Sequence, residues 1–422
     1  MDMVSTKQIF LHVFMIFIIL KNVSIEAEVI SPQDYKVNID DELKIFGGNR
    51  SSVSFSINST YEYENFLNFN LSTLKYVAVV TRHGSRSPFK SYPNDPYPYY
   101  NSKYWPDGIE QLTRYGKQQL YESGKILRDR YNGFISKHYI VEEISVRTNL
   151  YDRDFMSAAC LLAGLYPPSG YQEWNPFILW QPIPIWEQPY DVVPLGENPT
   201  LCPRYYNEMN KMKNELNNKG NQHTKLLEYV SNHTGTNIKY SELYDIGDTF
   251  IMQQENGFKL PEWSKLIYPE PLLSIYAMEF SVITAGTQEM ARLAAGPLLK
   301  KINSQLSKKA ERKMIPNRLM YIEAAHDSTL LVLFKSFGFN SPFVIETSAF
   351  MVFELHEYND KHFVQVLYYN SSAKTEPNIL NLPVCPTPCN INDFNYFVKS
   401  FSPVNWKEEC QLPKTINSQI QI

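Results

Sequence analysis

Unbroken runs of apolar and β-branched residues lie near both ends of the chain and predict buried strands. One run covers residues 75–81, and another lies in RLMYIEAA at residues 318–325. The segment EEISVRT at residues 142–148 predicts a shorter strand between them. Strands without polar alternation are typical of parallel sheets that helices cover on both faces.

Helical periodicity appears between and after these runs. One helix is expected over residues 113–131, a second begins near Asp152, and a long helical region covers residues 271–306. The helix after the last apolar run ends at Gly338, a residue type that is common at helix C-termini. Alternating residues in FMVFELHEYNDKHFVQVLYYN predict a hairpin with its turn at residues 359–360.

Strands and helices alternate at both ends of the chain, and short polar helices fill the middle. This order predicts an α/β fold with a central, mainly parallel sheet flanked by helices, and with an inserted smaller α-helical domain. We divide the chain into a signal peptide at 1–27, an N-terminal extension at 28–74, an α/β core at 75–170 and 285–412, and a mainly helical insertion at 171–284. Open α/β sheets bind ligands at the carboxyl ends of their strands, so we expect the functional residues there.

The first 27 residues have the pattern of a secretory signal peptide. Lys7 precedes an apolar run at residues 9–20, and Ala27 offers a cleavage site. The run is shorter than the roughly 20 apolar residues that span a bilayer, and its apolar side chains cover every face, unlike the stripe of a helix packed on a core. We expect a secreted protein without a stable membrane anchor, with the lysosomal lumen as the alternative location.

Overall charge and sequons fit an exported globular protein. The 422 residues carry a formal net charge of −4, which argues against a general nucleic-acid binder, because such proteins show basic patches. Sequons for N-glycosylation occur at Asn49, Asn58, Asn70, Asn232 and Asn370.

The chain has five cysteines, and an oxidising compartment allows disulfides. Cys385 and Cys389 flank Pro-Thr-Pro, so we expect a small local bridge between them. Cys202 and Cys410 would then form a long-range bridge. Cys160 lies in the apolar helical stretch MSAACLLAGL, where we expect a buried free thiol.

Charged and titratable side chains stand at the carboxyl ends of all three predicted strands. They are Arg82, His83 and Arg86 after the first strand, Arg147 and Arg153 at the second, and His326 and Asp327 after the third. Arginine is a permanently charged planar donor that suits phosphate oxygens, and Gly84 lets a phosphoryl group approach the backbone. A neutral imidazole is a good nucleophile towards phosphorus, and neighbouring cations disfavour its protonation. Since a carboxylic acid can protonate the leaving oxygen, the set predicts phosphoryl transfer through a phosphohistidine.

Each of these residues alone has a structural alternative. Arginines occur in surface ion pairs, a histidine can be satisfied in a core, and Asp327 can cap the helix that follows it. RHGSRSP after one apolar strand, together with AHDST after another, is much more specific than an isolated R-H-G triplet.

These motifs resemble those of the histidine acid phosphatase family, which includes prostatic, lysosomal and secreted insect enzymes. The resemblance covers about residues 75–412 and rests on RHGSRSP, WPDGIEQLTRYG, DRDFMSAA, WNPFILWQPIPI, CPR, AAHDST and CPTPC. It implies a phosphoglycerate-mutase-like fold and the same two disulfides. Relatives are often homodimers, so the resemblance allows a homodimer here.

The family pattern implies a role for each matching residue. His83 matches the nucleophile and Asp327 the proton donor, which leaves Arg147 outside the site. The residues that match phosphate contacts are Arg82, Arg86, Arg153 and His326. We expect no metal or other cofactor, because the arginines supply the positive charge and the sequence shows no metal-ligand pattern such as HxxxH.

Three features depart from the family pattern. Ser85 stands where the family usually has Asp, so any supporting role of that carboxylate is unfilled. The region of the family's third disulfide lacks cysteine, and residues 28–74 have no counterpart.

We therefore predict a secreted acid phosphatase that hydrolyses phosphate monoesters, either small molecules or phosphoproteins. A phytase or a lysophospholipid phosphatase would use the same chemistry with a different pocket. Another alternative is an inactive glycoprotein that keeps the fold as a binding or antigenic module. A serine hydrolase using Ser85 or Ser328 has no support from a G-x-S-x-G motif. The complete set of arginines, histidines and Asp327 favours the active phosphatase.

Overall fold

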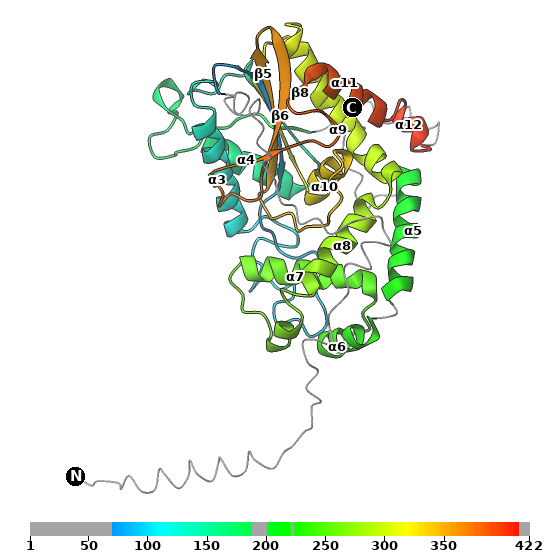
Figure 1. The fold of residues 1–422 in the computed structure, drawn as a ribbon. Helices are drawn as coiled ribbons and strands as arrows, with labels where there is room; N and C mark the ends of the chain where they lie inside the picture. The colour runs from blue at the N-terminus through cyan, green and yellow to red at the C-terminus, as the bar shows by residue number, and fades with distance from the viewer. Residues whose placement is uncertain (1–69, 188–200, 221–222, 413–422) are drawn as a thin grey trace, which may run out of the picture. The chain divides into compact units, whose positions relative to one another are not determined.

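The computed structural model describes residues 70–187, 201–220 and 223–412 (Figure 1). The predicted signal peptide, nearly all of the predicted extension, and the sequons at Asn49 and Asn58 lie outside the described residues. Within the described residues, the predicted α/β fold with a central sheet flanked by helices is confirmed.

One half of the sheet is parallel and contains the three strands predicted from the sequence. Its order is β3-β2-β4-β1, where β1 covers Leu74–Arg82, β2 Ile144–Thr148, β3 Trp186–Glu187 and β4 Met320–Ala325. All of β4 and all but one residue of β1 are buried, which explains why neither strand shows polar alternation.

Beyond β1 the sheet is antiparallel. It continues through β5 at Phe350–Tyr358, β6 at Lys361–Tyr369 and β7 at Asn378–Leu380, and β8 at Cys389–Asn390 also pairs with β6. The predicted hairpin is confirmed as β5 and β6. Its turn residues Asn359 and Asp360 have φ values of 49° and 59°. Asn and Asp are the non-glycine residues that tolerate this left-handed region best, so the turn chemistry fixes the hairpin.

Helices cover both faces of the sheet (Figure 1). One face holds α3 at Arg114–Arg130 and α4 at Asp152–Leu165, and the other holds α9 at Gln288–Ala310, α10 at Asp327–Ser336 and α11 at Ile391–Phe401. Successive β1 side chains point to opposite faces: Val77 and Val79 join the core under α3 and α4, whereas Tyr76, Ala78 and Val80 join the core under α9 to α11. Two hydrophobic cores thus hold β1 and fix the residues that follow it.

Two helix starts differ from the sequence prediction. The helical region expected at residues 271–306 is two helices, because α8 ends at Ala285 and the Thr287 hydroxyl caps α9 by accepting from the Met290 amide at 3.1 Å. At the start of α10 the N-cap is His326 rather than Asp327. Asp327 is instead the first residue of α10, where its Oδ1 accepts from the Ser328 amide and its Oδ2 pairs with Arg82.

The described part of residues 171–284 is mainly helical. It contains α5 at Pro203–Gly220, α6 at Thr224–Thr234, α7 at Leu243–Glu255 and most of α8 at Leu272–Ala285. It also contains β3, so the segment contributes one strand to the sheet. Shorter elements are α12 at Trp406–Glu409 and 3₁₀ turns at Gly170–Gln172, Tyr240–Glu242 and Glu262–Leu266. The division into core and insertion stays a prediction.

Two disulfides join the cysteines that were expected to pair. Cys202, just before α5, is bonded to Cys410, just after α12, across 208 residues of chain. Cys385 is bonded to Cys389. Cys160 in α4 is the free cysteine, and it is half-buried rather than fully buried as predicted. Partial burial raises the pKa of its thiol.

We expect the unreduced protein to show one titratable thiol after denaturation, at Cys160. Cys410→Ala should lower the free energy of unfolding by about 5 kcal/mol, because the long bridge closes a loop of roughly 200 residues in the chain-entropy account. Thiol titration and denaturant unfolding measure the two effects. Cys160→Ser breaks no bridge and is the stability control. Three or five free thiols would overturn the pairing.

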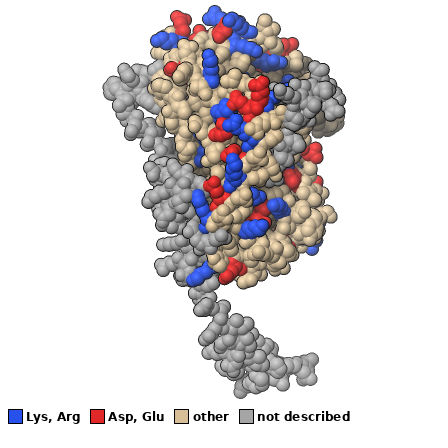
Figure 2. All heavy atoms as spheres, turned by 90° about the vertical axis from the view of Figure 1, so that its right-hand side faces the viewer, with Lys and Arg blue, Asp and Glu red and all other residues tan. Residues whose placement is uncertain are grey.

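Acidic and basic side chains are interspersed on the face that presents α5 and α12 (Figure 2). Between α5, α9 and α12, Arg292 pairs with Glu289 and Glu409, and Arg204 pairs with Glu289 at 3.0 Å. This mixture is consistent with the small net charge of the chain. Among the described helices, none is both long and apolar enough to cross a membrane.

Candidate active site

The carboxyl ends of β1 and β4 lie side by side, because the parallel register pairs Arg82 with Ala325. The next residues, His83 and His326, therefore meet, with their ring centroids 5.5 Å apart in an edge-to-face arrangement. The His83 amide also donates to the Ala325 carbonyl oxygen at 2.9 Å. The fold thus brings together the two motifs that the sequence places far apart.

His83 is a neutral imidazole with one nitrogen free. Its Nδ1 lies 2.8 Å from the Gly84 carbonyl oxygen, and a carbonyl can only accept, so Nδ1 carries the proton. Burial lowers the pKa of His83 well below its ordinary value, and Arg153 and Arg82 lower it further. The Nε2 lone pair therefore stays available at mildly acid pH, as attack on phosphorus requires.

Two arginines near His83 have buried donors without a described acceptor. Nη2 of Arg82 lies 2.8 Å from Oδ2 of Asp327, and its Nη1 donates to the Ile345 carbonyl oxygen. The Nε atoms of Arg82 and Arg153 are buried, and no described acceptor is within hydrogen-bonding reach of either. Buried donors are nearly always paired in native proteins, so these donors indicate an anionic ligand.

Arg86 is held by Asp248, a residue that the sequence prediction missed. Its two terminal nitrogens donate to the two Asp248 oxygens at 3.1 and 2.8 Å, which makes a buried bidentate pair. Asp248 lies on α7, within the predicted insertion, and no sequence motif marks it. The insertion therefore contributes to the site.

Asp248→Asn should weaken phosphate binding, because Arg86 would lose its charged partner while remaining buried. We expect KM for a phosphate monoester and Ki for inorganic phosphate to rise roughly tenfold, the equivalent of one charge-assisted hydrogen bond. Asp245→Asn on the same helix is the matched control, since Asp245 pairs at 2.7 Å with Lys90, whose side chain is 60% exposed. Steady-state kinetics and product inhibition are the measurements. Equal effects of the two variants would contradict a specific role for Asp248.

A carboxyl group from α7 lies beside Ser85. Glu255 accepts from the Thr347 hydroxyl at 2.8 Å, and the Ser85 hydroxyl accepts from the side-chain amide of Asn256, the next residue, at 3.0 Å. Gln119 accepts from the Ser85 amide at 2.8 Å and donates to Thr347 at 2.9 Å. Burial raises the pKa of Glu255. A hydrogen-bonded network thus supports the RHGSRSP loop although Ser85 itself has no carboxylate.

Asp154 is another residue that the prediction missed. It is fully buried on α4, and its Oδ2 lies 3.1 Å from Nε2 of His326. Burial raises the pKa of Asp154 well above its ordinary value and lowers the pKa of His326 to about 3, so a carboxylic acid faces a neutral imidazole. Neither carboxyl oxygen of Asp154 has a described hydrogen-bond partner, so its approach to His326 is a close contact between two buried groups.

Asp327 begins α10 with both carboxylate oxygens engaged. Oδ2 faces Arg82, and Oδ1 accepts from the Ser328 amide at 2.8 Å. Burial raises the pKa of Asp327, but Arg82, His326 and Arg86 together outweigh burial, and the net shift is downward. Asp327 is therefore ionised at mildly acid pH unless a ligand changes its surroundings.

Two residues near the strand ends have structural roles. Nη1 of Arg147 donates to the Glu187 carbonyl oxygen at 2.8 Å, at the edge of the sheet and outside the site. The sequence suggests that Gly84 makes room for a phosphoryl group. In the structure, a Cβ at Gly84 would also lie 2.3 Å from the Gly116 carbonyl oxygen in α3. Close packing of the RHGSRSP loop on that helix is therefore a second requirement for the glycine.

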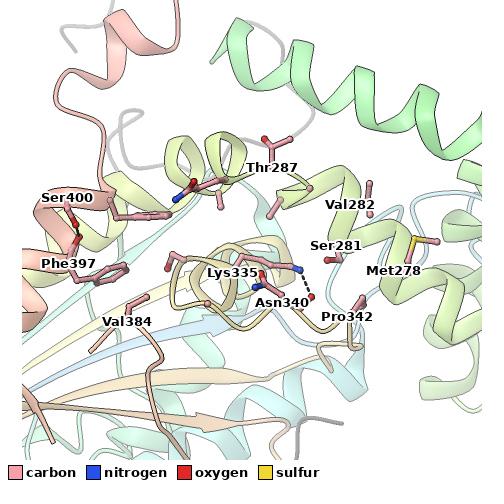
Figure 3. Close-up of a pocket in the computed structure, with 17 residues that line it drawn as sticks. Met278, Ser281, Val282, Thr287, Lys335, Asn340, Pro342, Val384, Phe397 and Ser400 are labelled. Carbon is pink, nitrogen blue, oxygen red and sulfur yellow. Dashed lines mark hydrogen bonds between the residues drawn. The ribbon is translucent and has the colours of Figure 1, made fainter. Parts of the chain in front are cut away.

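A cavity of about 580 Å³ lies where α8, α9, α10 and α11 approach one another (Figure 3). Lys335 extends along it near Ser281 and Asn340, and its amine donates to the Asn340 carbonyl oxygen at 2.7 Å. Burial lowers the pKa of Lys335 to about 8. None of the residues predicted to carry the chemistry lines this cavity, so it is separate from the site at the strand ends.

Known proteins resemble the chain in sequence and in fold. Residues 73–369 match the sequence profile of the histidine phosphatase superfamily, branch 2. Lysosomal acid phosphatase from Homo sapiens is 34% identical over 351 residues, which cover 81% of this chain and 81% of that protein. Prostatic acid phosphatase from Homo sapiens is 30% identical over 361 residues, which cover 80% of this chain and 88% of that protein. Phytase from Citrobacter braakii, at 17% identity, shares the fold with a TM-score of 0.60 over 80% of this chain and 98% of the phytase.

Proposed function

Because the chain belongs to branch 2 of the histidine phosphatase superfamily, we propose that it is an acid phosphatase that hydrolyses phosphate monoesters through a phosphohistidine on His83. The observation that carries this proposal is a neutral His83 next to buried arginine donors without described acceptors. A phosphate monoester has an electrophilic phosphorus that the His83 imidazole can attack, and anionic oxygens that the arginines can bind.

In the first step, Nε2 of His83 attacks the phosphorus, and an N–P bond forms as the P–O bond to the leaving group breaks. Arg82, Arg86 and Arg153 bind the phosphate oxygens, and the His326 ring donates a further hydrogen bond. Asp327 gives its proton to the leaving oxygen, so the product departs as a neutral alcohol.

Asp327 must hold a proton for this step, although Arg82 lowers its pKa in the structure. A bound phosphate monoester brings up to two negative charges to the same guanidinium. A like charge next to a carboxyl group raises its pKa. The substrate therefore favours the protonated form of Asp327 at mildly acid pH.

In the second step, water attacks the phosphorus from the side that the alcohol has left. Asp327, now ionised, takes a proton from the water as the new P–O bond forms. The N–P bond breaks, inorganic phosphate leaves, and His83 returns to its neutral form. Each step thus begins in the state that the previous one produced.

Hydrolysis of p-nitrophenyl phosphate and of p-nitrophenyl acetate at mildly acid pH tests the proposal. We expect turnover of the phosphate ester alone. Turnover of the acetate instead would favour a serine hydrolase, and turnover of neither would favour an inactive glycoprotein. A phytase and a lysophospholipid phosphatase share the chemistry, so a substrate profile distinguishes them.

The protein is further proposed to be secreted and N-glycosylated, with the lysosomal lumen as the alternative location. Among the sequons in described residues, Asn70 and Asn232 are exposed and Asn370 is half-buried. Two disulfides suit an oxidising compartment. Expression in a eukaryotic cell should release protein whose gel mobility shifts when N-glycans are removed. Retention in the cytosol without a shift would contradict this proposal.

A homodimer is proposed from the apolar residues near β3, the end strand of the described sheet. Trp186 in β3 is 59% exposed, and Phe177 and Leu179 in the preceding segment are 93% and 82% exposed. Clustered exposed apolar side chains mark protein interfaces, and a second copy would cover them. Sedimentation velocity should show a dimer that Trp186→Glu converts to a monomer. A monomeric parent protein would contradict the proposal.

A further inference from the structure

Glu110 has a φ of 57°, a left-handed conformation that is costly for most residues other than glycine. The loop around it is attached to the RHGSRSP segment on both sides. The Ser87 hydroxyl donates to the Gly108 carbonyl oxygen at 2.6 Å, and the Ser87 amide donates to the Gln111 carbonyl oxygen at 3.1 Å. Strain of this kind persists where surrounding contacts impose it, often at functional sites.

The Glu110 side chain reaches an arginine of the candidate site. Its Oε2 lies 2.8 Å from Nη1 of Arg153, whereas Nε of the same guanidinium has no described acceptor. Glu110 thus orients the guanidinium and leaves a donor for a phosphate oxygen. The Glu110 side chain is 40% exposed and that of Arg153 13%, so the carboxylate lies on the solvent side of the arginine.

A second carboxylate and an aromatic ring lie close to this pair. The exposed carboxylate of Asp152, at the start of α4, accepts from Nε2 of Gln111 at 3.3 Å. Gln111 is the residue after Glu110, so Asp152 contacts the same loop. The half-exposed ring of Tyr151 lies 4.4 Å from the guanidinium carbon of Arg153. A phosphate bound to Arg153 would therefore lie close to the Glu110 carboxylate and the Tyr151 ring.

We propose that Glu110 is a specificity-determining residue that selects against substrates with further negative charge near the scissile phosphate. The inference rests on the proposed phosphatase function and narrows its substrates to monoesters whose remaining part is neutral or cationic. Like charges repel across a partly solvated gap, and the effect acts on the second and later phosphates of a polyphosphorylated substrate. The opposite arrangement, a cationic rim, would attract a substrate with several phosphates.

Glu110→Gln tests the proposal, because glutamine removes the charge and keeps an oxygen that can accept from Arg153. The probes are p-nitrophenyl phosphate, phosphocholine and inositol hexakisphosphate. The ratio of kcat/KM for inositol hexakisphosphate to that for phosphocholine should rise roughly tenfold in the variant, as the loss of one unit charge near a partly exposed site predicts. Added salt should narrow the difference in this ratio between the unmodified protein and Glu110→Gln, because it screens the carboxylate that distinguishes them.

Asp107→Asn is the matched control. Asp107 lies in the same loop, its side chain is also 40% exposed, and it pairs with Lys117 at 2.9 Å rather than with an arginine of the site. Its ratio should change by less than about twofold, since exposed pairs contribute little. Glu110→Gly should reproduce the change of Glu110→Gln and raise the melting temperature, because glycine relieves the positive φ.

Failure of this inference differs from failure of the proposed function. If the unmodified protein does not hydrolyse p-nitrophenyl phosphate, both are wrong. If it does, and Glu110→Gln changes all three substrates by one common factor, the phosphatase stands and Glu110 only orients Arg153. An unchanged ratio, or an equal change in Asp107→Asn, also overturns the selection.

Discussion

Replacing His83 with alanine is expected to remove phosphoenzyme formation and to lower kcat for p-nitrophenyl phosphate by roughly four orders of magnitude or more, as loss of a covalent nucleophile does in other hydrolases. The reason is the Nε2 lone pair, which stays free because Nδ1 donates to the Gly84 carbonyl oxygen. Burial and the adjacent arginines keep the pKa of His83 low, so the imidazole remains neutral at mildly acid pH. Without it, the arginines still bind phosphate, but no nitrogen attacks phosphorus.

The measurement is a rapid base quench of the protein during turnover of phosphate-labelled substrate. The label should appear on His83, survive base and be lost in acid, as a nitrogen–phosphorus bond requires. His138→Ala is the matched control, because His138 is a half-buried histidine whose ring centroid lies 4.8 Å from that of Tyr171, away from the strand ends. That variant should keep both label and turnover. Acid-stable label on a serine, or full labelling of His83→Ala, would refute the mechanism.

The residues around His83 fall into two groups that differ in how far the sequence reveals them. Arg82 ends β1, and His83 and His326 directly follow β1 and β4, two almost fully buried strands that are mainly apolar although β4 contains Glu323. Local pattern therefore locates the strands, and the rule that ligands bind at their carboxyl ends locates the chemistry. The parallel register of β1 and β4 then brings these residues together.

The partners of these residues leave no local signal. Asp248 lies on α7 and contacts Arg86, which is 162 positions away in the sequence. No motif in the sequence of α7 distinguishes Asp248 from its other polar residues. Asp154 sits beside Arg153 in sequence, but only its full burial against His326 distinguishes it from a surface carboxylate. Glu110 has a positive φ in a loop that is held by hydrogen bonds from Ser87 to its neighbours. The conformational preferences of glutamate do not predict this backbone conformation. Tertiary packing determines the contacts of Asp248 and Asp154 and the conformation of Glu110, and these cannot be predicted from local patterns in one sequence.

The carboxyl groups from α7 connect the predicted insertion to the residues at the strand ends. Asp248 neutralises Arg86, and Glu255 accepts from Thr347, which Gln119 links to the Ser85 amide. Without Asp248, the buried guanidinium of Arg86 would lose the partner that offsets its desolvation. The predicted core therefore has an incomplete set of partners by itself, and α7 completes it.

Asp327→Asn should separate the proton donor from the nucleophile, because the need for a proton depends on the leaving group. An alkyl phosphate expels a strongly basic alkoxide, which requires a proton in the transition state. A nitrophenyl phosphate expels a stabilised phenolate, which requires it far less. We expect phosphorylation of His83 to slow by roughly 10²–10⁴-fold for the alkyl ester, the usual contribution of a general acid, and only mildly for the nitrophenyl ester.

Dephosphorylation should slow for both esters in Asp327→Asn, because the same carboxylate takes the proton from the attacking water. Phosphoenzyme should therefore accumulate with nitrophenyl phosphate, whose first step stays fast. Rapid-quench measurement of both steps at mildly acid pH gives the two rates separately. Equal slowing of the first step with both esters would mean that Asp327 does not protonate the leaving oxygen. Its ion pair with Arg82 at 2.8 Å would then be its role, holding that guanidinium for the phosphate.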